Sequence, residues 1–586
     1  MADSHINTHY YMLVLLLIYC GTHSLVYQVL PSSQYSCQTQ PCLTLSQFAS
    51  DISSYLQSNT TLTLIFQPGN HILNVTLRVE SALSLQLSSI LTLNASSVVC
   101  VQSRLELFNV TSVYVAKLKF IGCSVRSELI DHFLIEDAMF FGQKKSSSAL
   151  ELIRSTAIVN SSSFFSNMVG NLKPVMLRKI KNHAVAMAYV GGAVLLTQSN
   201  VVIIQSLFKQ NSAEIGGAIF CEGHGNVTVI NTTFERNRVT TWHNATVCYG
   251  GAVYCQHGCY LKLENSTFDS NKAVGRNVNN GVFSGGAVAA VGPVKLDIND
   301  CIFIDNEATS DGGAVYIWKG TVSINSTVFD DNYVDGCGGA IYLEGSGLSI
   351  MRVIENITKS DKLHGESISS KSLMNQSQFN NVTALDDKAT EIKDLDTLMV
   401  ITLSQFTGNG AYFMGGAICA SYCAVDIIWS DFDDNTAYTE QGGVFSGSVV
   451  IITVTESEFS NNVAEKDDGG AFHTLSSIFI INRSKFTTSE GTRGGVLSCW
   501  NNSTVIINMS VFDGNIGSDG GAIFVSTGAL SIHWGEFSHN EARYDGGALH
   551  TYMASVNITR CGFTFNEAGS NGGAVRLQNI LSLIHI

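Results

Sequence analysis

The stretch CIFIDNEATSDGGAVYIWKGTVSINSTVFDDN, residues 301–332, holds one complete repeat and the start of the next. It reads Phe-x-x-Asn from residue 303, Gly-Gly-Ala from residue 312 and Phe-x-x-Asn again from residue 329. Short runs of β-branched and aromatic residues follow the Gly-Gly pair and precede the Phe, and neither run is long enough for a helix. One such unit cannot bury its apolar face, whereas a stack of units can. We therefore predict a solenoid of short β-strands.

The same motifs recur over most of the chain. Gly-Gly pairs followed by Ala or Val begin at Gly191, Gly216, Gly250, Gly285, Gly312, Gly338, Gly415, Gly442, Gly469, Gly494, Gly520, Gly546 and Gly572. From Gly415 onward the pairs are 25 to 27 residues apart, and Phe-x-x-Asn precedes most of them. Phe379 and Phe486 depart from the motif, because Val382 and Ser489 stand at the Asn position. Two or three strands plus turns fit this length, so we predict an all-β parallel β-helix that rises about 4.8 Å per coil.

Stacking would place like residues above one another. The Phe positions should form an interior aromatic stack, and the Asn positions an amide ladder at a corner. The Gly-Gly pair permits positive φ at another corner. Asp often precedes the pair, as a turn acceptor would, at Asp311, Asp468, Asp519 and Asp545. Calcium binding by these carboxylates is the alternative, although no spacing matches a known oxygen cage.

The repeats resemble those of the polymorphic outer membrane protein family, known from chlamydial surface proteins with GGAI and FxxN signatures. The resemblance covers residues 191–580, where both signatures recur in order. It implies a right-handed, single-stranded parallel β-helix of the pectin-lyase type, displayed outside the cell and associated with adhesion. Together with the glycosylation sequons described below, it points to a eukaryotic, invertebrate relative.

Sequence signals divide the chain into seven parts. These are a signal peptide over 1–24, an N-terminal cap and first coils over 25–123, irregular coils with a loop insertion over 124–190, repeats over 191–342, degenerate coils with a charged loop over 343–403, repeats over 404–580, and a sequencing-adaptor artefact over 581–586. The apolar run Met12–Ile18 is too short to span a bilayer. A helix after Thr44 would cap the first coil. The adaptor reading implies that this sequence is a fragment whose missing C-terminal part could hold a membrane anchor. The two irregular segments are either solvated loops or binding loops.

Composition narrows the partners and the compartment. The net charge of −15 excludes nucleic acid and an anionic membrane surface, because both require a basic face. Of the 15 cysteines, 14 would remain after removal of the signal peptide, and the chain holds 18 Asn-x-Ser/Thr sequons. Both features favour a secreted or cell-surface protein in an oxidising compartment. The candidate glycosylation sites are Asn59, Asn74, Asn94, Asn109, Asn231, Asn265 and Asn508.

The cysteines suggest disulfides, with several pairings open. Cys37 and Cys42 are close enough in sequence to bridge. Cys221 and Cys255 each lie five residues after the first Gly of their pair, so they would stack on adjacent coils, and Cys248 could then pair with Cys259. The rival is a local Cys255–Cys259 bridge, mirrored by Cys419 and Cys423. A zinc site at Cys248, Cys255, His257 and Cys259 is a further alternative to disulfides.

Catalytic motifs are weak in this sequence. Gly223-His224-Gly225 imitates a polygalacturonase motif, but the aspartate pairs Asp330-Asp331 and Asp433-Asp434 come later in the chain and the basic run at 178–181 comes earlier. No Ser-His-Asp set, phosphate loop or dinucleotide fingerprint occurs. We therefore name no catalytic, cofactor or metal residue.

These observations predict a non-catalytic extracellular scaffold for adhesion or for binding glycans or proteins. A secreted polysaccharide-active enzyme, either a lyase or a glycoside hydrolase, and a structural matrix component are the alternatives. Calcium is the one cofactor kept open, and the sequence leaves the oligomeric state open.

Overall fold

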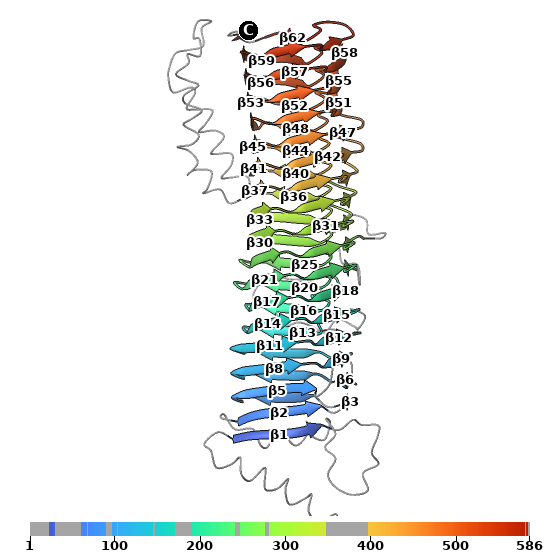
Figure 1. Ribbon diagram of the computed structural model, residues 1–586, viewed down its shortest axis with the longest axis vertical. Coiled ribbons are helices and arrows are strands. Elements are labelled where there is room, and N and C mark those ends of the chain that lie inside the picture. Colours follow the sequence, from blue (N-terminus) through green and yellow to red (C-terminus); the bar gives the residue numbers. More distant parts are fainter. Residues whose placement is uncertain are drawn as a thin grey trace, which may run out of the picture. The chain divides into compact units, whose positions relative to one another are not determined.

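The computed structural model describes residues 23–29, 60–66, 68–74, 76–89, 96–101, 103–143, 147–169, 190–240, 247–275, 281–346, 397–580 and 582–583 (Figure 1). Every regular element among them is a β-strand, and none of them belongs to a helix able to span a membrane. The chain divides into two compact units, one ending at Thr267 and one beginning at Phe268. The predicted capping helix and almost all of the predicted signal peptide lie outside the described residues.

One coil of the second unit runs through four strands: β45 Ile451–Thr455, β46 Glu458–Ser460, β47 Val463–Ala464 and β48 Phe472–Leu475. Each pairs in parallel with its counterpart one coil later: β49 Ile478–Asn482, β50 Lys485–Thr487, β51 Glu490–Arg493 and β52 Leu497–Trp500. In the first unit β17 Asn200–Ile204, β18 Leu207–Lys209, β19 Ser212–Ala213 and β20 Ile219–Glu222 repeat the pattern, and each pairs in parallel with a strand of the next coil. Each unit is therefore a parallel β-helix, as the repeat predicts.

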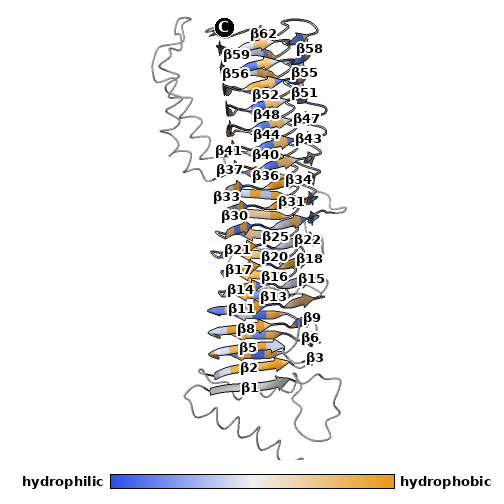
Figure 2. Ribbon diagram, in the orientation of Figure 1, coloured by the Kyte–Doolittle hydropathy of each residue, from blue (hydrophilic) through white to orange (hydrophobic). Residues whose placement is uncertain are grey.

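Burial alternates along the strands. In β17 the side chains of Val201 and Ile203 are buried, while Val202 and Ile204 between and beside them are partly exposed. Figure 2 shows the same interleaving of apolar and polar residues along the stacked strands. Because successive side chains of a strand point to opposite faces, one face of each strand fills the interior of its coil.

The predicted Phe column is confirmed. Within each unit the rings of successive coils stack nearly parallel, with centroids 4.6–4.9 Å apart, as between Phe303, Phe329 and Phe406. The separation equals one strand spacing, so the aromatic stack follows directly from the repeat.

The predicted Asn ladder is also confirmed. The side-chain amide of Asn306 donates to Oδ1 of Asn332 at 3.0 Å, and Asn332 donates in the same way to Asn409. The amide of Asn332 donates as well to the Phe303 carbonyl oxygen of the preceding coil at 2.9 Å. Ser489 interrupts this ladder, because its shorter side chain replaces the amide.

The two glycines of each pair have different tasks. Gly312 has φ of 65°, which is the positive value expected at this corner. Gly313 is needed for close approach, since an added Cβ would lie 2.0 Å from the Gly339 carbonyl oxygen of the next coil. Positive φ is therefore confirmed for the first glycine, and contact between coils explains the second.

The strand pairings bear on two of the predicted segments, residues 124–190 and 343–403. In the first, β10 Val125–Glu128, β11 His132–Glu136 and β12 Met139–Phe141 pair in parallel with β13 Leu150–Ile153, β14 Thr156–Asn160 and β15 Ser163–Phe165, which is the regular pattern of one coil stacked on the next. In the second, β36 Ile341–Glu344 pairs directly with β40 Ile418–Ser421, although Gly338 and Gly415 are 77 positions apart in the sequence. β37 Leu398–Thr402 continues the coil that β36 begins, since both pair with β33 Val315–Asn325. β36 and β37 are therefore successive strands of one coil, and residues 347–396 between them lie outside the described residues.

Candidate functional site

The motifs examined for catalysis occupy separate places. Gly223-His224-Gly225 forms the turn between β20 and β21 Asn226–Ile230 in the first unit, with φ of 84° at Gly223. His224 is exposed, and its ring packs against Gly258 of the next coil. The two Asp pairs belong to the second unit, where they end β34 Val328–Asp330 and β42 Asp431–Asp433. The Gly-His-Gly residues therefore act as a turn, and the basic run at 178–181 lies outside the described residues.

An open polar pocket lies on the side of the second unit. It has a volume of about 530 Å³ and is lined by Ser270, Lys272, Asp305, Asn306, Glu307, Asp331 and Tyr333. Three short parallel strands form one wall: β28 Lys272–Ala273, β32 Glu307–Ala308 and β35 Tyr333–Val334. The corner that precedes these strands forms the other wall. Three successive coils thus contribute the same two positions to one pocket.

The corner positions follow from the Asn ladder. Ser270, Asp305 and Asp331 each precede a buried ladder Asn and have φ of 54°, 53° and 50°. Asp tolerates this left-handed conformation better than most residues do. Because the next side chain points inward to the ladder, the corner side chain points outward to solvent. The repeat therefore exposes one corner residue per coil, and the pocket forms where two of these are acidic.

The pocket carries excess negative charge. Glu307 forms an ion pair with Lys272, while Asp305 and Asp331 add two further carboxylates. Burial raises the pKa of Asp331, and the carboxylates of Asp330 and Asp434 raise it further. Gly408, one coil on, leaves room for the Asp331 carboxylate, since an added Cβ would lie 2.4 Å from Oδ1.

Aromatic side chains continue the strand wall beyond the pocket. Burial raises the pKa of Tyr333 to about 12. The negative charge of Asp335 and the hydrogen bond that the phenol donates to its carboxylate act in the same direction. The ring of Tyr438 lies 6.4 Å from that of Tyr333, with Gly410 between them. Tyr412 and Phe413 lie beside this pair, edge to face at 5.2 Å, and are 46% and 42% exposed. Carboxylates and exposed aromatic rings therefore share one face.

A second exposed column occupies a different corner of the second unit. It consists of Leu403, Trp429, Glu456, Arg483, Met509, Trp534 and Arg560, which follow strand ends in register. Trp429 Nε1 donates to Glu456 at 2.6 Å, and Arg483 forms an ion pair with the same carboxylate at 2.8 Å. Arg560 lies over the Trp534 ring at 5.0 Å. The charged groups of this column are therefore already paired within it.

The Asp residues before the glycine pairs have protein partners. Asp468 accepts from Arg493 at 2.9 Å, and Asp545 accepts from Arg576 at 2.9 Å and from the side chain of Asn571 at 2.8 Å. Asp311 accepts a hydrogen bond from the backbone of Cys337. These contacts give the carboxylates a structural role at the turn.

The cysteines lie partly as the sequence suggests. Cys221 and Cys255 are in register on adjacent strands, which confirms their predicted stacking. Cys259 lies in the same cluster as these two residues. Cys248 instead has Glu214 as its charged neighbour. Cys419 has the Cys337 thiol as its hydrogen-bond partner. The buried thiol of Cys423 is in the same coil as Cys419. Cys37 and Cys42 lie outside the described residues. All the proposed pairings stay predictions.

One disulfide was not expected from the sequence. Cys100 and Cys123 are bonded, with Cα atoms 4.9 Å apart and a sequence separation of 23. That separation is close to the length of one coil, and it is the feature of the sequence that could have indicated this disulfide. It was missed because the Gly-Gly motif does not mark the N-terminal coils.

The glycosylation candidates differ in access. Asn74, Asn109, Asn231 and Asn265 are exposed, and the last two lie on adjacent coils, where Asn265 donates to Asn231. Asn508 is half-buried, and its amide donates to Asn482 at 2.9 Å. Asn59 and Asn94 lie outside the described residues.

Comparison with known proteins supports the fold. A family model described as a right-handed β-helix region matches residues 171–356. This match and the parallel stacking of the strands establish a right-handed parallel β-helix, as predicted. No curated protein matches the chain. Since this fold carries many chemistries, the function has to be argued from the residues on its surface.

Proposed function

We propose that the protein is a non-catalytic extracellular scaffold that binds neutral glycans in the pocket between Asp305, Asp331 and Tyr333. The observation that carries the proposal is the combination of free-standing carboxylates and exposed aromatic rings on one face. Carboxylates accept strong hydrogen bonds from sugar hydroxyls, and aromatic rings pack against the C–H face of a pyranose. The predicted signal peptide, the sequons, the Cys100–Cys123 disulfide and the likeness to the polymorphic outer membrane protein repeats support an extracellular location.

Charge selects the class of glycan. The pocket has three carboxylates and one ammonium group, and the chain has a net charge of −15. An acidic polysaccharide would have to bring its own carboxylates against these groups, which costs free energy. A hydroxyl-rich neutral glycan meets no such repulsion. We therefore expect neutral oligosaccharides to bind and uronic acid oligosaccharides to be rejected.

The test is binding of neutral and acidic oligosaccharides to the full chain, measured by calorimetry. Asp305→Asn combined with Asp331→Asn should weaken the binding of neutral glycan about tenfold, because charge-assisted hydrogen bonds become neutral ones. Tyr333→Ala should have a similar effect. Preferred binding of acidic glycans, or unchanged affinity in these variants, would overturn the proposal.

Control variants exist outside the pocket. Glu541 occupies the strand position of Glu307 several coils away, so Glu541→Gln removes the same charge outside the pocket. Trp429→Ala removes an exposed aromatic ring at another corner. Both variants should bind neutral glycan as the unmodified chain does.

A glycoside hydrolase is the second candidate. Asp305 and Asp331 occupy the same corner position on adjacent coils and face one open pocket, and a pair of nearby carboxylates is what glycoside hydrolysis requires. Asp331 also has a raised pKa, which a proton donor needs. Incubation of the full chain with the glycan that it binds separates the two functions. Release of shorter oligosaccharides would favour the enzyme, and intact glycan would favour the scaffold.

A further inference from the structure

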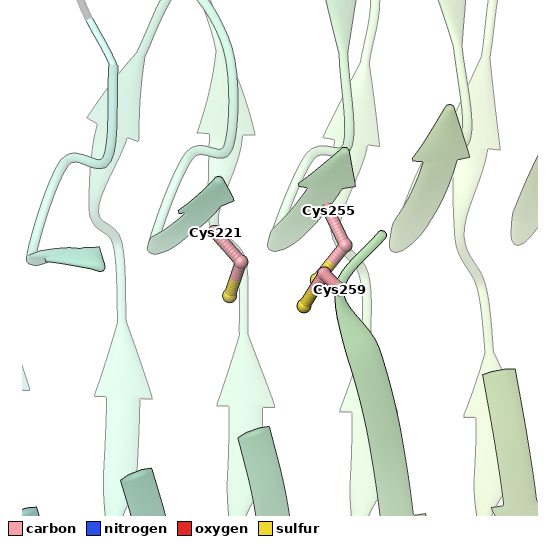
Figure 3. A group of neighbouring side chains, drawn as sticks. All are labelled: Cys221, Cys255 and Cys259. Carbon is pink, nitrogen blue, oxygen red and sulfur yellow. The ribbon is translucent and has the colours of Figure 1, made fainter. Parts of the chain in front are cut away.

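Three cysteines of the first unit gather inside the β-helix. Cys221 belongs to β20 and Cys255 to β25 Val253–Gln256, which pair in register on adjacent coils. Cys259 enters from the turn before β26 Tyr260–Glu264. Figure 3 shows the thiol groups of the three residues turned toward one another from two coils.

The geometry is close and the site is closed to solvent. The three sulfur atoms all lie within 4.8 Å of one another, and those of Cys255 and Cys259 are 3.5 Å apart. The residues are 1%, 0% and 2% exposed. Each pair of sulfurs is therefore near enough to bond after a small side-chain rotation, and a reagent in solution has no direct access.

Charge decides between a metal ion and a disulfide. A d¹⁰ cation would need deprotonated sulfurs, and three thiolates around Cu⁺ or Zn²⁺ leave a net negative charge in an apolar interior. A structural zinc site also takes four ligands, and the group found among the described residues has three. A disulfide with one thiol beside it is neutral, so it avoids both costs.

We propose that Cys221, Cys255 and Cys259 form a buried exchange site that holds one disulfide and one thiol, in which any two of the three sulfurs can bond. To form it, two thiols give up two protons and two electrons to a disulfide-bonded oxidant of the secretory compartment, which is reduced to two thiols. The third sulfur keeps its proton. In later exchange that sulfur, as a thiolate, attacks the disulfide, and the sulfur that leaves takes up the proton, with no net oxidation.

In the folded, reduced cluster one sulfur is favoured as the thiolate. Hydrogen bonds from Cys221 and from Cys255 lower the pKa of Cys259 to about 5, although burial opposes them. Burial raises the pKa of Cys255 well above its usual value. Cys259 is therefore the thiolate of the cluster. Because the folded coils exclude solvent, oxidation takes place before the coils close over the site.

Two of the three bonds join neighbouring coils. Cys221–Cys255 and Cys221–Cys259 would link β20 to the following coil, whereas Cys255–Cys259 stays within one coil. Exchange therefore converts a link between coils into a link within a coil while the redox state remains constant.

The experiment is peptide mapping by mass spectrometry on the full secreted chain, with thiols alkylated before or after denaturation at low pH. We expect one alkylated cysteine among the three, and only after denaturation, with the other two in a disulfide. Three single variants test each bond: Cys221→Ser, Cys255→Ser and Cys259→Ser. Each should leave the remaining two cluster cysteines bonded and no free thiol in the cluster. Cys499→Ser, at a buried thiol of the second unit, is the control and should leave this pattern unchanged.

Three results would overturn the proposal. These are alkylation of all three cluster cysteines in the unmodified chain, a single variant whose remaining pair stays reduced, and a stoichiometric zinc or copper ion released by a chelator. If a variant is not secreted, the thiol count of the unmodified chain still decides, because one free thiol in three is expected.

Discussion

At the scale of single residues, burial of Asp311 in a turn disfavours the charged form of its carboxyl group. Burial raises its pKa to about 6, the backbone hydrogen bond from Cys337 opposes that shift, and the charge of Glu344 adds to it. The folded pKa lies above the unfolded value, so the folded chain binds more protons than the unfolded chain between about pH 4 and pH 6. The contribution of this carboxyl to stability is therefore favourable at acidic pH and is lost as the pH rises through 6.

Asp311→Asn should stabilise the chain at pH 7. The amide keeps an oxygen to accept the Cys337 hydrogen bond and carries no charge, so we expect a gain of about 2 kcal/mol at neutral pH and almost none near pH 4. Urea unfolding of the full chain at both pH values measures the difference. Glu465→Gln, at an exposed carboxylate, is the control and should change stability little. An equal gain at both pH values would show that charge is not the cause.

At the scale of elements, the stability of each corner depends on an unbroken ladder. Asn435 donates to Asn462 Oδ1 at 3.0 Å and to the Phe406 carbonyl oxygen at 2.9 Å. Ser489 stands at the next step, and its hydroxyl contacts only the Thr487 carbonyl oxygen, at 3.4 Å. The amide of Asn462 therefore has no ladder acceptor on the following coil, although it still bonds to Phe432.

Ser489→Asn should rejoin the two halves of the ladder. A new amide would accept from Asn462 and donate to Asn515, and we expect stabilisation by about 1 kcal/mol in urea unfolding. Asn435→Ser is the matched reverse change and should cost about 1–3 kcal/mol, because it leaves buried partners unsatisfied. Destabilisation by both changes would mean that the corner at Ser489 is too narrow for an amide.

The repeated columns could be predicted from the sequence alone, whereas the pocket and the full cysteine cluster could not. Phe303, Asn306 and Gly312 recur in register, so their columns follow from spacing. The pocket could not be predicted, because Asp305 and Asp331 are ordinary turn residues until stacking sets them side by side. The sequence pairs Cys259 with Cys248 or with Cys255, and its approach to Cys221 could not be predicted, because the repeat does not specify the turn that brings the two together.

At the scale of the whole molecule, a chain that lacks residues 345–397 tests whether the described coils alone hold the stack. β36 ends opposite Trp318 and β37 begins opposite Thr321, and in the preceding coil Lys319-Gly320 spans the same gap. Replacing residues 345–397 with Lys-Gly should therefore keep the register. It should also raise the free energy of unfolding by about 2 kcal/mol, because a shorter loop costs less entropy to close.

Urea unfolding of the full chain measures this change, and a Gly-Ser linker of the original length is its control. The linker variant should have the stability of the unmodified chain, since its loop is equally long. Loss of stability in the Lys-Gly variant would show that residues 345–397 contribute contacts to the stack.

The net charge of the whole chain supplies the last prediction, because it acts on every ligand that approaches. A neutral glycan has no charge to repel, so its affinity should change less than about twofold between roughly 50 and 500 mM salt. A uronic acid oligosaccharide should instead bind weakly at low salt and better at high salt, where screening reduces its repulsion from the −15 charge. Calorimetry across this range measures both. Affinity for acidic glycans that falls with salt would mean that a basic surface binds them, and the acidic pocket around Tyr333 could not be the site.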